Sequence, residues 1–158
     1  MKNDYGTVEI GDALANWLGR RPFVREQFEV AGGLNADSSA AELARFFALT
    51  RVTDEPLAMI NPNIDLLWHK FLEFTAEYEQ FCSQEFGGII HHLPRTSTTP
   101  VPDLAVRNFY DQYAKYFGAL PAAWEAGTPT AVTRYGRRQS DALPADFRWS
   151  GWPGRPRK

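Results

Sequence analysis

The chain has 158 residues, of which 44% are hydrophobic and 23% charged, and its net charge is −2. This length and balance predict one globular domain with its own core and exclude a disordered polypeptide. The chain has a single cysteine and an N-terminus without a secretory signal, which excludes a disulfide-stabilised secreted scaffold. It has no apolar run of about 18 to 20 residues, which excludes a membrane span. We therefore expect a cytoplasmic protein.

Apolar residues recur at helical spacing through most of the first 127 residues, which predicts an all-α or mainly α domain over 1–127. Glycines and prolines separate the periodic segments and mark where helices end. Ser39 and Glu42 have the spacing of a capping box at one helix start. About five helices are predicted, over residues 8–18, 22–30, 39–49, 62–84 and 103–117.

The longest predicted helix, over 62–84, is expected to lie at the centre of the domain, with the others packed around it. Pro62 suits its first turn, and Gly87-Gly88 stops it. A short extended segment, 89–93, follows. The helix would present one wide apolar arc made of Ile64, Leu67, Trp68, Phe71, Phe74, Tyr78, Phe81 and Cys82.

Residues 128–158 lose this periodicity and are rich in proline, glycine and arginine, so we expect an irregular tail packed on the domain. Residues 134–158 contain seven basic and two acidic residues, whereas the rest of the chain carries a net negative charge. The tail mixes arginines with aromatic residues, which also suits a protein partner. Nucleic acid is an unlikely partner for a chain whose main part is acidic.

All three histidines and the only cysteine lie within residues 69–92. Histidine is the commonest metal ligand and the natural acid or base near neutral pH. Asp65 precedes His69 by four residues and Glu73 follows it by four, so a continuous helix would place all three side chains on one strip.

The extended segment can bring a second histidine to this strip. Six extended residues cover about 20 Å, and a helix rises about 25 Å from His69 to residue 86, so a chain that doubles back brings His91 or His92 near His69. Neighbouring residues of an extended segment point to opposite sides, so we expect only one of the two to face it. Cys82 lies about 20 Å along the helix from His69, and we expect it to be a small buried hydrophobe.

Three interpretations of the histidines stay open: ordinary salt bridges and backbone hydrogen bonds, a metal site, or metal-free acid–base chemistry. The leading hypothesis is a metal or small-ligand site with zinc or iron as the divalent metal, although no CxxC or HExxH motif supports it. A non-enzymatic protein-interaction module is the alternative. The candidate metal ligands are Asp65, His69, Glu73, His91 and His92, and Trp68 and Tyr78 are the candidate pocket residues.

A composite pattern runs through residues 61–94: Asp-x-x-Trp-His on a helix, Tyr-x-x-Phe-Cys, then His-His-x-Pro. Its members are Asp65, Trp68-His69, Tyr78, Phe81-Cys82, His91-His92 and Pro94. The pattern resembles the glycine-rich domain-containing-protein-like family, and flanking helices extend the resemblance over about residues 40–125. The chain lacks the glycine-rich region of the plant members, so it resembles a small bacterial-type member. The resemblance implies that the Trp-His and His-His-x-Pro elements form one unit, and it implies no settled reaction or cofactor.

Overall fold

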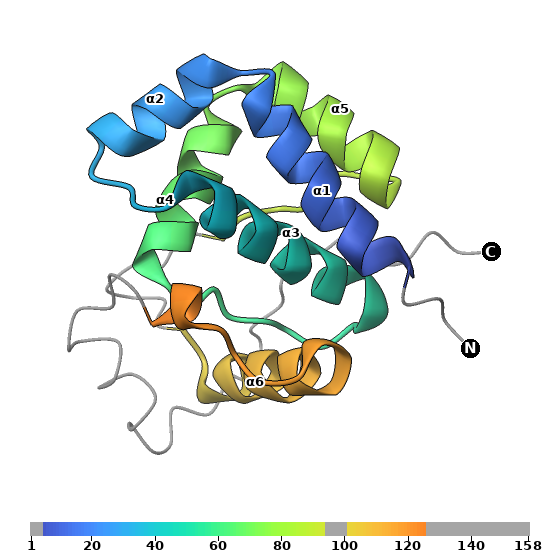
Figure 1. Ribbon diagram of the computed structural model, residues 1–158. Coiled ribbons are helices and arrows are strands. Elements are labelled where there is room, and N and C mark those ends of the chain that lie inside the picture. The colour runs from blue at the N-terminus through green and yellow to red at the C-terminus, as the bar shows by residue number, and fades with distance from the viewer. Residues whose placement is uncertain (1–4, 94–100, 126–158) are drawn as a thin grey trace.

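The structure is a computed structural model that describes residues 5–93 and 101–125, with side chains described from residue 11. Over these ranges all of its regular secondary structure is helical and it contains no strand, which confirms the predicted fold class (Figure 1). The elements are α1 (Tyr5–Gly19), α2 (Pro22–Val30), α3 (Ala36–Val52), α4 (Pro62–Leu72), α5 (Thr75–Phe86), α6 (Asp103–Phe117) and the 3₁₀ helix η1 (Ala122–Trp124).

Helix α3 takes the central place in the fold. In Figure 1 it lies between α1 on one side and α6 on the other, and it also packs against α4. Its apolar side chains are enclosed by rings from several helices: Phe47 contacts Trp68, Tyr78 and Phe86, while Phe46 contacts Phe109. The core is therefore built on large aromatic side chains, each of which buries much apolar area.

The predicted continuous helix over 62–84 was wrong, because the chain breaks at Glu73 and Phe74 into α4 and α5. Phe74 has φ −97° and ψ 67°, outside the helical region. In a continuous helix Trp68 and Tyr78 would lie about 15 Å apart along the axis. Instead, Trp68 Nε1 donates a hydrogen bond to the Tyr78 hydroxyl over 3.0 Å. The break thus lets both halves of the apolar arc converge on one core.

The predicted capping box at Ser39 was also wrong. Helix α3 begins three residues earlier, after Asn35, and Ser39 lies inside it with its hydroxyl bonded to the Leu34 carbonyl. Glu42 is consequently free of any capping role. Its side chain is buried and accepts hydrogen bonds from Tyr113 and Trp124, which attach α6 and η1 to α3.

Two of the sequence-based expectations fall on residues that the structure does not describe. The predicted tail, 128–158, and the boundary between it and the helical domain lie outside the described ranges. Among the helices that are described, none combines the length and the apolar character needed to cross a membrane.

Candidate functional site

Helix α4 supplies the first two residues of the site. Its start is fixed by Asn61, whose side-chain oxygen accepts hydrogen bonds from the backbone N–H groups of Asn63 and Ile64 at 2.9 and 3.0 Å. Asp65 lies in the first turn, where the helix dipole favours a carboxylate. One turn later His69 faces the same side, and its Nε2 lies 3.4 Å from Asp65 Oδ2.

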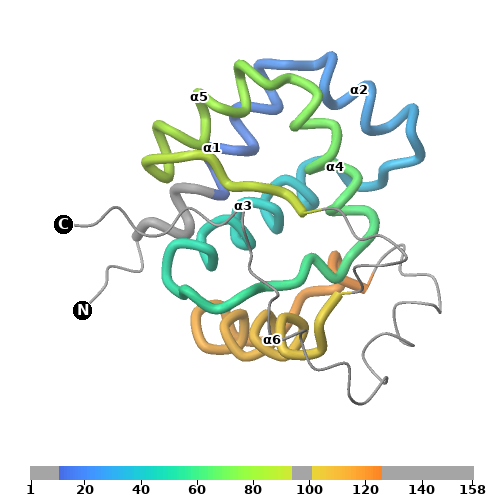
Figure 2. The backbone as a smooth tube through the Cα atoms, turned by 180° about the vertical axis from the view of Figure 1, so that it is seen from behind, coloured from blue at the N-terminus to red at the C-terminus, as the bar shows by residue number. Residues whose placement is uncertain are grey.

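The segment after α5 supplies the third residue. Gly87 ends α5 in a left-handed conformation, with φ 74°, that glycine adopts without strain. The chain then turns back and runs toward α4, as Figure 2 shows from behind. It is held there by Tyr78, whose hydroxyl donates to the Ile90 carbonyl. The fold-back expected from the sequence is present.

His92 is the histidine that this segment brings to α4. Its Nε2 lies 2.7 Å from Asp65 Oδ1 and 3.1 Å from His69 Nε2. The His92 side chain is only 8% exposed, against 31% for Asp65 and 46% for His69. The site is therefore closed on the His92 side and open to solvent on the His69 side.

The spacing of these atoms is compatible with two chemistries. Within the described part of the chain, one ligand atom each from Asp65, His69 and His92 lies within 4.8 Å of the other two, and no other group of three or more histidine, cysteine or carboxylate ligand atoms is this compact there. Ligands bound tetrahedrally at 2.0–2.1 Å lie about 3.3 Å from one another. The separations of 3.1 and 3.4 Å are near that value and the 2.7 Å contact is shorter, and all three also suit hydrogen bonds in which one imidazole donates and the other accepts.

Two predicted ligands, Glu73 and His91, are not brought into this group. Glu73 lies at the end of α4, where the chain leaves the helix, and its carboxylate pairs with Lys70 at 2.8 Å. His91 is exposed, as the alternation along an extended segment requires when its neighbour His92 faces inward.

The two predicted pocket residues lie behind the site rather than in an open cavity. Trp68 and Tyr78 are 4% and 3% exposed. The Trp68 ring packs edge-on against the His92 ring, with 4.3 Å between centroids. Burial, followed by the nearby Cys82, raises the pKa of Tyr78, so its hydroxyl stays protonated and able to donate. Both residues support His92.

Cys82 is fully buried, as predicted, and burial raises the pKa of its thiol. Hydrogen bonds from the backbone of Ile90 and from Tyr78 act in the opposite direction. Cys82 therefore lies beside the segment that carries His92, a position that the sequence pattern did not indicate.

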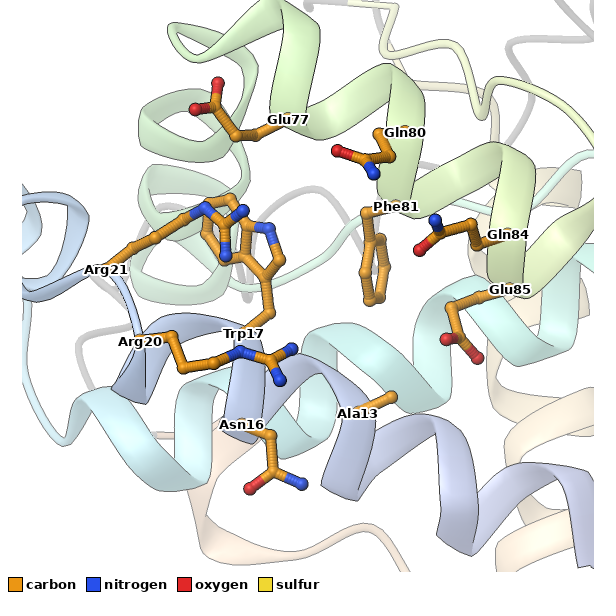
Figure 3. Close-up of a pocket in the computed structure, with 10 residues that line it drawn as sticks. All are labelled: Ala13, Asn16, Trp17, Arg20, Arg21, Glu77, Gln80, Phe81, Gln84 and Glu85. Atoms are coloured by element: carbon orange, nitrogen blue, oxygen red, sulfur yellow. The ribbon is translucent and has the colours of Figure 1, made fainter.

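A separate hollow of about 370 Å³ lies between α1 and α5 (Figure 3). Trp17 and Phe81 form its apolar part, and the Arg21 guanidinium stacks on Trp17 at 4.6 Å. Two arginines just after the end of α1 and two glutamates of α5 line it, so its charge is mixed. None of the histidine-site residues contributes to it, and the sequence analysis did not single it out.

Residues 23–103 match the model of a family described as UCP032817-like. This is half of the chain, from α2 to the start of α6, and it includes all three residues of the histidine site. No curated protein and no solved structure matches the chain.

Proposed function

The chain belongs to the UCP032817-like family, a description that names no activity, and we propose from its own side chains that it binds a divalent metal ion through Asp65, His69 and His92. The observation that carries the proposal is the convergence of two imidazole nitrogens and a carboxylate oxygen, supplied by α4 and by the segment after α5, with 2.7 to 3.4 Å between the closest atoms.

The chemistry of the donor set supports a transition metal. Two imidazoles and one carboxylate suit zinc and ferrous iron, whereas calcium and magnesium prefer oxygen ligands alone. Asp65 and His69 are held on one helix, so two of the three ligands are arranged before any ion binds. This preorganisation lowers the entropic cost of binding.

The uneven exposure of the three side chains supports a centre with an open coordination position. Three protein ligands leave a place for water or a substrate, as in catalytic rather than structural zinc sites. The exposed side of His69 would face that place. A metal held there would supply polarisation of a bound oxygen atom. The two imidazoles and the carboxylate would hold it.

The test compares metal binding by the wild type with that of His69→Ala, His92→Ala and Asp65→Asn. Each protein is stripped with a chelator and titrated with Zn²⁺ by calorimetry, and with Fe²⁺ under anaerobic conditions. We expect one ion per wild-type chain and at least a tenfold weaker affinity in each variant, because each loses a ligand.

His91→Ala is the matched control, since it removes a neighbouring histidine that is exposed and outside the group. Its affinity should equal that of the wild type. Absence of stoichiometric binding by the wild type, or an equal loss in His91→Ala, would contradict the proposal. The non-enzymatic interaction module expected as the alternative would then be the better hypothesis.

A further inference from the structure

The segment that carries His92 is anchored at one residue, Ile90, two positions earlier. Ile90 is 6% exposed, and its carbonyl accepts a hydrogen bond from the Tyr78 hydroxyl. Cys82, one turn after Tyr78 on α5, is buried beside the same residue. From this arrangement we infer that Tyr78 is the positioning residue of the metal centre and sets its affinity through His92. The inference rests on the proposed function.

Tyr78 acts on His92 along two routes at once. Its hydroxyl donates to the backbone of the segment that carries His92 and accepts from Trp68 Nε1 at 3.0 Å. The Trp68 ring is the surface on which the His92 ring packs. One hydroxyl group therefore fixes both the backbone that delivers the imidazole and the aromatic face that orients it.

Removal of this hydroxyl would affect one ligand out of three. The Trp68 indole N–H and the Ile90 carbonyl would both be left buried without their partner, which is unfavourable enough to displace the segment toward water. Asp65 and His69 lie on α4, whose N-terminus is capped by Asn61, so the position of neither residue depends on Tyr78. Tyr78→Phe should consequently remove the contribution of His92 and leave the other two ligands in position.

Tyr113→Phe is the matched control. Tyr113 is also a buried phenol, 1% exposed. Its hydroxyl donates a hydrogen bond to Glu42 at 2.6 Å and accepts one from Arg45 at 3.1 Å. Its partners lie on α3, away from His92. Both variants lose one buried hydroxyl with two hydrogen bonds, so a general loss of stability affects them alike.

The experiment measures two quantities in the full chain. One is the Zn²⁺ affinity, supported by the visible absorption of bound Co²⁺, which reports the number and kind of ligands. The other is the nuclear Overhauser contact between the His92 and Trp68 rings in the chelated protein. We expect Tyr78→Phe to weaken Zn²⁺ binding about 10- to 100-fold, the range found for outer-shell partners, to alter the Co²⁺ spectrum and to lose the ring contact. Tyr113→Phe should keep all three.

Unchanged Zn²⁺ affinity in Tyr78→Phe, or a ring contact that persists in it, overturns the inference. If the wild type itself binds no zinc, the proposed function fails, and an effect of Tyr78 on zinc affinity cannot exist. The contact between the His92 and Trp68 rings alone then decides whether Tyr78 positions His92. If Tyr78→Phe does not fold, Cys82→Ala, which removes the buried thiol beside Tyr78 and Ile90, should give a smaller loss of affinity. Wild-type affinity in that variant would overturn the inference too.

Discussion

Two carboxylates of this domain, Glu42 and Asp65, have opposite surroundings. Glu42 is 5% exposed, and its oxygens accept hydrogen bonds from Tyr113 Oη and Trp124 Nε1, each at 2.6 Å, and from Arg45 at 3.0 Å. All three partners are donors within the protein. This carboxylate is therefore satisfied by the fold itself and joins α3 to α6 and η1.

Asp65 is partly exposed, and its close partners are the imidazoles of His69 and His92. No lysine or arginine pairs with it in the part of the chain that the structure describes. An imidazole nitrogen can donate or accept, and His69 and His92 also face each other at 3.1 Å. Under the proposed function, the contrast indicates that a buried carboxylate can be purely structural, while a partly exposed one beside two converging imidazoles binds the ion.

The largest expected effect tests the structural role of Glu42, the buried carboxylate of this comparison. Glu42→Ala would leave two buried donors without a partner and should lower the free energy of unfolding by about 3 kcal/mol. Urea unfolding in a chelating buffer measures it. Glu79→Ala, which removes an exposed carboxylate of α5, should change the value by less than about 0.5 kcal/mol. A Glu42→Ala loss below about 1 kcal/mol would mean that the Glu42 network contributes little to folding.

The second effect concerns pH and the same network. Burial, followed by the hydrogen bond to Glu42, raises the pKa of Tyr113 from 10.0 to about 12. The folded state therefore keeps the phenol neutral after the unfolded chain has begun to ionise. The stability that Tyr113 contributes is complete below pH 10 and is lost as the pH rises from 10 toward 12.

The loss should approach about 1.4 kcal/mol per pH unit in that interval. The difference in unfolding free energy between the wild type and Tyr113→Phe, measured from about pH 9 to 11, isolates this residue from other groups that titrate there. If that difference stays constant with pH, the phenol is not held neutral by its surroundings, and the Glu42 network is more accessible to water than its burial indicates.

Much of the fold followed from local pattern. The helical period of apolar residues predicts the all-α class, and together with glycine and proline positions it predicts the bounds of α2 and α6. The break between α4 and α5 did not follow, because Phe71, Phe74 and Tyr78 continue the helical period and no glycine or proline interrupts it. Tertiary packing decides it: the hydrogen bond from Trp68 to Tyr78 needs two helices.

The same distinction between local pattern and tertiary packing applies to the site. The convergence of Asp65 and His69 follows from a spacing of four residues on a helix, and the approach of His92 from chain length and alternation. The same spacing places Glu73 one turn after His69, but its carboxylate pairs with Lys70 instead. The local pattern around Glu42 predicts a cap, while its actual partners, Tyr113 and Trp124, lie 71 and 82 residues away along the chain.

The smallest expected effect tests Asp65, the partly exposed carboxylate of the comparison. In chelating buffer, Asp65→Ala should change the free energy of unfolding by less than about 1 kcal/mol, because partly exposed pairs and a first-turn carboxylate each contribute little. With free Zn²⁺ at about 100 times its Kd, the wild type should gain about 2.7 kcal/mol and the variant far less. The cost of losing Asp65 would then appear only when metal is present, whereas the cost of losing Glu42 is the same with and without it. A metal-free loss as large as that of Glu42→Ala would make Asp65 a structural carboxylate like Glu42, and the imidazoles around it would be hydrogen-bond partners of the fold.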